Sequence, residues 1–166
     1  MHGKIKILLV LFAISTHWLT GCDSNAPELV LYTDGEQVSV PAFTIRIDLT
    51  DAAKKKLKNS GESIKGTVVF DGDGTPLPRI KTAPHRDVYL GSAEFETEKL
   101  GTVKIAHATI SKEAYSRLSD KNYHFTINVV SGRRTFKNNI LTGGYARGRF
   151  SDLNNNKALK ITCDLF

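Results

Sequence analysis

Alternation of hydrophobic and polar residues along the chain predicts a domain built mainly of β-strands. The segment 43–49 alternates strictly, and the segment 123–130 repeats the pattern. A period of two, with polar residues on the opposite face, indicates a half-buried strand. Shorter apolar runs bounded by turn residues predict further strands at 28–33, 64–70, 88–95, 103–110, 140–150 and 159–166.

Two short helices are expected between these strands. Thr50 can cap a helix over 51–58, in which Asp51 suits the positive end of the helix dipole and the lysines suit the negative end. Gly61 lies just beyond its expected end. Ser111 can cap a second helix over 112–118. Both are too short for the crossover helices of a doubly wound α/β fold.

The spacing of strands and turns predicts an all-β domain. About seven or eight short strands separated by turn signals are typical of a β-sandwich. The aspartate–glycine run 71–74 indicates a turn after the strand at 64–70. We therefore predict that residues 28–166 form one immunoglobulin-like or transthyretin-like sandwich with two short helices. A small α+β fold is the alternative.

The first 22 residues indicate export. Lys4 and Lys6 precede an apolar run at 7–14, which is typical of a secretory signal. The sequence Leu-Thr-Gly-Cys that ends at Cys22 resembles the bacterial lipoprotein box. The resemblance implies that residues 1–21 are removed and that Cys22 carries acyl chains such as palmitate. Residues 22–27 would then tether the domain to a membrane of the cell envelope, facing the periplasm.

The residue after the lipidated cysteine bears on the choice of membrane. Asp23 resembles an inner-membrane retention signal of enteric-type bacteria. Other lineages sort lipoproteins differently, so inner and outer membrane both stay open.

Basic residues are concentrated in the C-terminal part of the expected mature chain. Removal of Lys4 and Lys6 from 23 basic residues leaves 21 against 17 acidic ones, a net charge of +4. No acid separates the cations between Asp120 and Asp152, and aromatic residues lie among them. Arginine and tyrosine are favoured at protein interfaces, and basic patches steer acidic partners. We predict a partner-binding surface formed by Arg133, Arg134, Phe136, Lys137, Tyr145, Arg147 and Arg149.

Other interpretations of these charges remain open at this point. A solvated face explains the same residues equally well. Nucleic-acid binding is not expected of an exported protein. The lysines at 54–56 and 58 could contact anionic headgroups beside the tether. The acids Asp87, Glu94, Glu96 and Glu98 could pair with the basic segment inside the fold.

The sequence contains no recognisable catalytic or metal-binding motif. His85, His107 and His124 are scattered, and no GxSxG elbow is present. Cys163 is the one thiol left if Cys22 is acylated, and its strand position predicts a buried core residue. The run 71–74 lacks the later acids of an EF-hand loop. We therefore predict no catalytic residue, no metal and no cofactor.

These features together favour a non-catalytic lipoprotein that binds a partner protein. The leading hypothesis is an immunity or inhibitor protein that neutralises an antibacterial secreted effector, for example a type VI lipase effector. The first alternative is an accessory subunit of a secretion machine, a class that includes a type VI secretion lipoprotein with a transthyretin-like sandwich. The second is an envelope-maintenance lipoprotein that binds lipid or peptidoglycan. An enzyme would need a cleft in which a histidine meets a carboxylate or hydroxyl.

Overall fold

The chain folds mainly into β-sheet. The computed structural model describes residues 33–34, 36–75, 87–153 and 158–166, and the predicted leader, Cys22 and Asp23 lie outside them. One four-stranded sheet has the order β10-β8-β4-β5 and comprises Tyr145–Arg149, His124–Ser131, Ile64–Asp73 and Asp87–Thr97. The other has the order β6-β3-β11-β9 and comprises Gly101–Ile105, Phe43–Leu49, Leu159–Leu165 and Leu141–Thr142. A small third sheet, β1-β2-β7, comprises Thr33–Asp34, Gln37–Ser39 and Thr109–Ser111.

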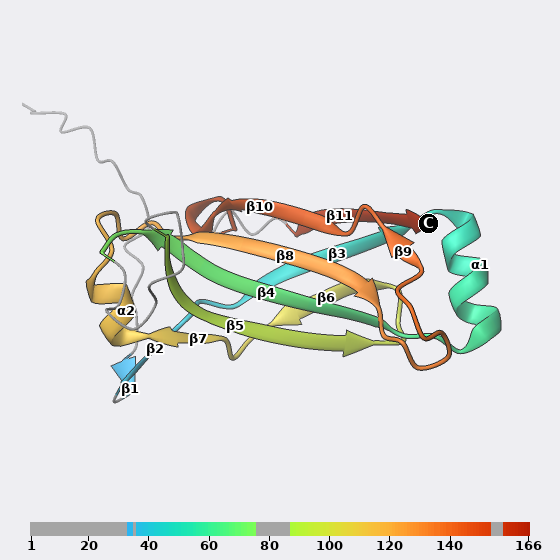
Figure 1. Ribbon diagram of the computed structural model, residues 1–166, viewed down its shortest axis with the longest axis horizontal. Coiled ribbons are helices and arrows are strands. Elements are labelled where there is room, and N and C mark those ends of the chain that lie inside the picture. Colours follow the sequence, from blue (N-terminus) through green and yellow to red (C-terminus); the bar gives the residue numbers. More distant parts are fainter. Residues whose placement is uncertain (1–32, 35, 76–86, 154–157) are drawn as a thin grey trace, which may run out of the picture.

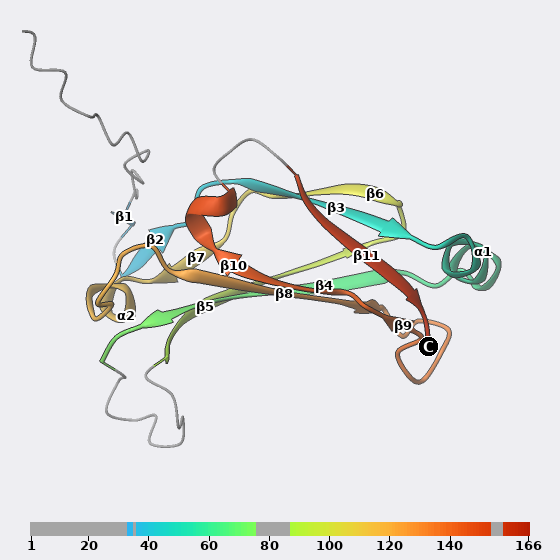
Figure 2. The ribbon, with the colours of Figure 1, turned by 90° about the horizontal axis from the view of Figure 1, so that it is seen from above.

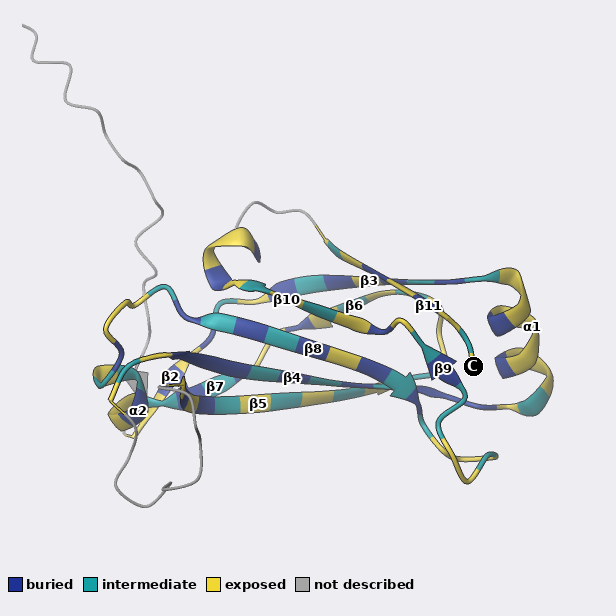
Figure 3. Ribbon diagram, turned by 45° about the horizontal axis from the view of Figure 1, so that its top comes forward, coloured by how far each residue is buried: buried dark blue, intermediate teal, exposed yellow. Residues whose placement is uncertain are grey.

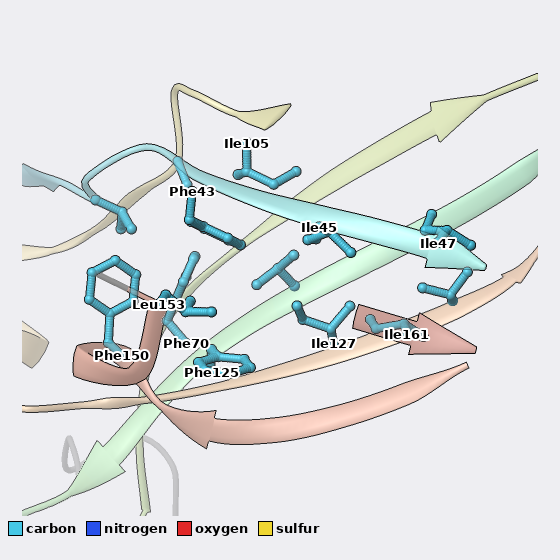
Figure 4. Close-up of a cluster of buried hydrophobic side chains, with 14 of the residues drawn as sticks. Phe43, Ile45, Ile47, Phe70, Ile105, Phe125, Ile127, Phe150, Leu153 and Ile161 are labelled. Atoms are coloured by element: carbon cyan, nitrogen blue, oxygen red, sulfur yellow. The ribbon is translucent and has the colours of Figure 1, made fainter. Parts of the chain in front are cut away.

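The two four-stranded sheets face each other across one hydrophobic core. Seen from above, β3, β6 and β11 form one layer, and β4, β5 and β8 form the other (Figure 2). Buried residues alternate with partly buried or exposed ones along β3 and β8, so each strand turns one face to the core (Figure 3). Phe43 of β3 meets Phe70 of β4 edge to face, with ring centroids 6.4 Å apart (Figure 4). The core is therefore closed by side chains from both sheets.

Among the described strands the pairing is antiparallel with one exception. The strands β3 and β11 run parallel, with Ile45 opposite Leu159 and Leu49 opposite Cys163. Cys163 is fully buried, which confirms its predicted core position. Burial raises the pKa of its thiol, so the thiol stays protonated near neutral pH.

Several predicted boundaries differ from those of the structure. The strand at 43–49 is confirmed with the same ends. The turn predicted at 71–74 is wrong, because β4 continues to Asp73 and pairs with β5 through a bulge after Phe70. The segment 103–110 divides into β6 and β7, and the segment 140–150 divides into β9 and β10. The predicted strand at 28–33 lies almost entirely outside the described residues.

Both predicted helices are present. The helix α1 spans Asp51–Ser60, with the Thr50 hydroxyl accepting from the Ala53 N–H at 3.3 Å. It ends at Gly61, whose φ of 64° is the left-handed conformation that favours glycine. The helix α2 spans Lys112–Ser116 and is capped by Ser111, and a 3-10 turn covers Phe150–Leu153. None of the helices that the structure describes is long and apolar enough to cross a membrane.

The domain has two distinct ends. The helix α1 lies at one end of the sheets, whereas β1 and α2 lie at the other (Figure 1). The element β1 is the first described one after the predicted tether, so the described chain begins at the end opposite α1. The predicted tether lies outside the described residues, so the expectation that the α1 lysines contact headgroups beside it stays a prediction.

Candidate functional site

A buried carboxylate organises the loop that follows β8. Glu62 is 5% exposed and follows the Gly61 cap of α1. Its Oε1 accepts from the N–H groups of Ser63 and Arg134, both at 3.0 Å. Its Oε2 accepts from Thr135 at 2.9 Å and from Phe136 at 3.1 Å. Three consecutive loop amides thus converge on one side chain, which fixes the backbone path of residues 134–136.

The ionised form of Glu62 is the form that holds the loop. Burial of the carboxyl opposes ionisation, but the four backbone donors together outweigh burial and lower the pKa of Glu62 below its ordinary value. An ionised carboxylate has acceptor capacity for all four donors, whereas a protonated carboxyl must place a hydrogen among them. The loop is therefore tied to an anion that the chain itself supplies.

Other polar residues near Glu62 add to this support. The buried polar residues of the described chain are Glu62, Ser63, Asp71 and Ser131, and three of these four surround the loop. The Ser63 hydroxyl donates to Glu96 at 2.6 Å. At the far side of the loop, Asn139 accepts from the Ser131 N–H at 2.8 Å and donates to the Leu141 carbonyl at 2.7 Å. Satisfied buried polar networks specify one geometry, so this loop is pre-organised.

Arg133 adopts an unusual backbone conformation at the start of this loop, two residues after the end of β8. Its φ is 60°, and among the described residues it is the one non-glycine residue with a positive φ. This conformation costs about 1–2 kcal/mol for a residue with a Cβ. The Arg133 side chain is exposed. Strain of this kind concentrates at functional sites, so Arg133 is a candidate binding residue.

The predicted basic surface divides into two groups. Arg133, Arg134, Phe136 and Lys137 lie on the loop near α1, whereas Tyr145, Arg147 and Arg149 lie on the outer face of β10. Tyr145 is 61% exposed. Arg147 pairs with Asp71 at 2.9 Å, and Arg149 pairs with Asp120 at 3.3 Å. The β10 arginines are therefore largely compensated within the fold.

Arg134 is also compensated. Its Nε lies 2.7 Å from a Glu96 oxygen, and its Nη1 contacts Glu98. The predicted pairing of the acidic residues with the basic segment is thus confirmed for Glu96 and Glu98. Arg133 and Lys137 are exposed and form no ion pair with any residue that the structure describes. The uncompensated charge of the loop rests on these two side chains.

The lysines of α1 lie next to this loop, at the same end of the domain. The Lys56 ammonium lies 4.9 Å from the centroid of the Phe136 ring, a cation–π contact. The Thr135 hydroxyl donates to the Ser60 carbonyl at 2.8 Å. We call residues 51–62, 96–100 and 132–137 the basic end. It carries eight basic and four acidic residues, a net +4, which equals the net charge of the whole expected mature chain.

The basic end contains a pocket between α1 and the β5–β6 turn. The pocket has a volume of about 360 Å³, with Leu57 and Ile64 as apolar lining and Leu100 at the turn. Two lysines, Lys54 and Lys58, and two glutamates, Glu62 and Glu98, add charged groups to its walls. A second, shallower hollow of about 470 Å³ lies on the other side of α1, next to Lys55 and Lys56. The sequence did not reveal either hollow or the role of Glu62, because these depend on contacts between distant parts of the chain: Glu62 accepts from amides 72 to 74 residues away, and the second hollow joins α1 to Leu165.

The histidines give no catalytic arrangement among the described residues. His124 Nδ1 lies 3.8 Å from Asp71 Oδ1, beyond hydrogen-bond reach, and that oxygen already accepts from Arg147. Burial raises the pKa of Asp71, and the Arg147 guanidinium opposes the rise. His107 is exposed between β6 and β7, and His85 lies outside the described residues. Within the described ranges, no group of three or more His, Cys, Asp or Glu could hold a metal ion.

Comparisons with known proteins add no relative. No protein-family model matches the chain, and no curated protein and no solved structure shows significant similarity to it.

Proposed function

We propose that the chain is a lipid-anchored, periplasm-facing protein that binds an acidic partner protein through its basic end. The observation that carries this proposal is the pre-organised loop 132–137, whose Glu62-bound backbone presents Arg133 and Lys137 without compensating acids among the described residues. The backbone strain at Arg133 supports it, because residues in sparsely populated conformations cluster at functional sites. In this proposal the protein is not an enzyme and needs no cofactor or metal.

The role that fits best is immunity. An inhibitor stationed at the membrane must recognise an incoming effector quickly, and a concentrated positive charge steers an acidic partner toward its site. We propose that the partner is an antibacterial secreted effector, for example a lipase delivered by a type VI system. The basic end lies opposite β1, where the described chain begins, so a tether through residues 22–27 leaves this end free to face the periplasm.

A second role is favoured by the strand order. In an immunoglobulin-type sandwich the second strand pairs with the first and the fifth. If β3 is counted as the first strand, β4 is the second. It pairs with β5 and β8, whereas β3 lies in the opposite sheet. This order supports a transthyretin-like sandwich, the architecture of the type VI secretion lipoprotein named above. An accessory subunit of a secretion machine is therefore the second candidate.

Replacement of Cys22 by alanine tests the lipid anchor. We expect the wild-type chain to sediment with membranes and the Cys22→Ala chain to be released in soluble form, because acyl chains supply the membrane affinity. Fractionation of cells followed by a high-salt wash measures the distribution. A variant that stays with membranes after the wash would contradict lipid anchoring at Cys22.

Charge reversal at Arg133 and Lys137 tests the binding surface. The full chain, with an affinity tag placed after Asn25 in the predicted tether, is extracted from native membranes and its partners are identified by mass spectrometry. We expect a stoichiometric partner with an acidic surface, and capture reduced about 10-fold or more by Arg133→Glu with Lys137→Glu. Arg134 is left unchanged, because its ion pairs with Glu96 and Glu98 hold the loop.

Two outcomes of this capture experiment are decisive for the role. A toxic hydrolase as partner supports immunity, whereas a membrane component of a secretion machine supports the accessory role. As a folding control, Arg133→Gly should keep or raise stability, because glycine tolerates a φ of 60°, and should still weaken capture. Undiminished capture by both variants would return the basic end to an ordinary solvated face.

A further inference from the structure

The loop 132–137 is a raised part of the surface with a fixed shape. Figure 3 shows the connection between β8 and β9 projecting beyond the ends of these strands. Arg133, Thr135 and Lys137 are exposed, so the outward side of the loop is open to solvent. Glu62 holds the backbone of residues 134–136 from the buried side. A partner therefore meets a convex element that is ordered before binding.

A recessed surface lies directly beside this raised loop. The hollow of about 470 Å³ next to α1 is lined by Ala52, Lys55, Lys56, Asn59, Ser60 and Leu165. The loop contacts two of these residues. The Thr135 hydroxyl donates to the Ser60 carbonyl at 2.8 Å. The Lys56 ammonium lies 4.9 Å from the centroid of the Phe136 ring. The loop and the hollow therefore form one continuous surface with a convex and a concave part.

The charges that line the hollow have one sign. Lys55 and Lys56 are its charged residues, and neither forms an ion pair with any part of the chain that the structure describes. The acid next to Leu165 in the chain is Asp164, whose Oδ1 accepts from the Thr50 hydroxyl at 2.6 Å. Successive residues of a strand point to opposite faces, so Asp164 does not join Leu165 in the lining of the hollow. The hollow thus extends the uncompensated positive charge of the loop.

We propose that the loop 132–137 enters an acidic cleft of a partner enzyme while one wall of that cleft rests in the hollow beside α1. The inference rests on the proposed function in its immunity role, and it specifies how the partner is neutralised: the loop occupies the cleft in which the enzyme binds its substrate. Substrate sites are concave, and a pre-organised loop loses little conformational entropy on entering one. Because the loop and the hollow both carry unpaired cations, the matching cleft has carboxylates on its floor and on its wall.

Protection of introduced thiols tests whether the partner covers the loop and the hollow at once. Asn138→Cys places a thiol directly after the loop, and Asn59→Cys places one in the hollow. Cys163 is fully buried, and Cys22 is acylated in the proposed function, so the introduced thiol dominates the labelling. The tagged full chain, captured with its partner from native membranes, is treated with biotin-maleimide. We expect labelling at both positions to slow by about 10-fold or more in the complex, because interface cores exclude solvent.

A control position and a cross-link complete this experiment. Ser92→Cys, exposed on β5 away from the basic end, should be labelled equally in the free chain and in the complex. A photo-reactive p-benzoylphenylalanine in place of Asn138 should form adducts with the partner. Mass spectrometry should map these adducts to residues that line the catalytic cleft of the partner enzyme.

Charge reversal at Lys55 tests the contact between the hollow and the wall of the cleft. Lys55→Glu should weaken partner binding by about 5-fold or more, because a like charge then faces the carboxylates of the wall. Lys104→Glu is the matched control, since Lys104 is an exposed lysine on β6, outside the basic end. It should change the affinity by less than about 2-fold. Circular dichroism establishes that both variants are folded.

Several outcomes would overturn the inference. Protection at only one of the two thiols, adducts outside the cleft, or unchanged affinity of Lys55→Glu would exclude insertion but leave the proposed function standing, because a partner is still captured. Capture of no partner would overturn both. Protection of the two thiols by phosphatidylglycerol vesicles, added to the full chain in phosphatidylcholine nanodiscs without any partner, would assign this surface to a membrane instead of an enzyme.

Discussion

Replacement of Glu62 by glutamine should release the loop 132–137 and lower the free energy of unfolding by about 2–4 kcal/mol. The change keeps the size of the side chain but replaces one carboxylate oxygen by an amide NH2 group, which donates and cannot accept. Each carboxylate oxygen now accepts from two backbone N–H groups. In the glutamine variant, two backbone N–H groups therefore face the side-chain NH2 group, which is itself a donor. A buried donor without an acceptor costs about 1–3 kcal/mol.

Urea unfolding and amide hydrogen exchange measure this effect at two levels. The midpoint of unfolding reports the global loss, and the exchange rates of the Arg134, Thr135 and Phe136 amides report release of the loop. Partner capture should fall together with loop order, because Arg133 and Lys137 then lose their fixed positions. Glu94→Gln is the matched control, since Glu94 is exposed on β5 in a surface pair with Lys65. It should change stability by less than about 0.5 kcal/mol.

The same carboxylate should make the loop sensitive to acid. The pKa of Glu62 lies below its ordinary value of 4.5 in the folded chain. Between the folded and the unfolded pKa, the unfolded chain binds more protons at this group, so stability rises with pH there. The contribution of Glu62 is therefore complete above about pH 4.5 and is lost as the pH falls through the folded pKa. Glu62→Gln should remove this pH-dependent part of the stability. If the loop amides of the wild type stayed equally protected from hydrogen exchange at low pH, the proposed role of the ionised Glu62 carboxylate would be contradicted.

The parts of the fold that could be predicted from sequence are those set by local periodicity and capping. The alternation at 43–49 produces a strand, and the caps Thr50 and Gly61 delimit a helix, through interactions between residues that are close in the sequence. The structure confirms both elements. The run at 71–74 misled because two aspartate–glycine pairs usually mark a turn. Here the bulge after Phe70 lets β4 continue, and Arg147 from β10 compensates Asp71.

The candidate site was only partly accessible from sequence, for a similar reason. The cations at 133–149 stand out as a run, but their state of compensation depends on acids that are distant in the chain. Arg134 is separated from Glu96 by 38 residues and Arg147 from Asp71 by 76. Glu62 appears in the sequence as an ordinary surface residue after a helix. Its role arises because the sheet returns the end of β8 to the C-terminus of α1.

Truncation of Phe70 to alanine should have the largest effect on stability of any change considered, about 3–5 kcal/mol. Phe70 is fully buried and packs edge to face against Phe43, Tyr123 and Phe150, at centroid distances of 6.4, 6.0 and 6.3 Å (Figure 4). Alanine there leaves a cavity between the sheets. Domains of this size are stable by about 5–15 kcal/mol, so the variant should unfold at much lower urea concentration or fail to accumulate.

The milder variant Phe70→Leu separates stability from binding. It should cost about 1–2 kcal/mol and leave the chain folded at low temperature. Phe70 lies six residues along β4 from Ile64 of the pocket, about 20 Å in an extended strand, and sites so far apart act independently. Folded Phe70→Leu should therefore capture partner as the wild type does. Capture by Phe70→Leu could instead fall in proportion to its loss of stability, as is expected for Glu62→Gln. The loss of capture in both variants would then reflect general unfolding, and the basic end would have no separate role in binding.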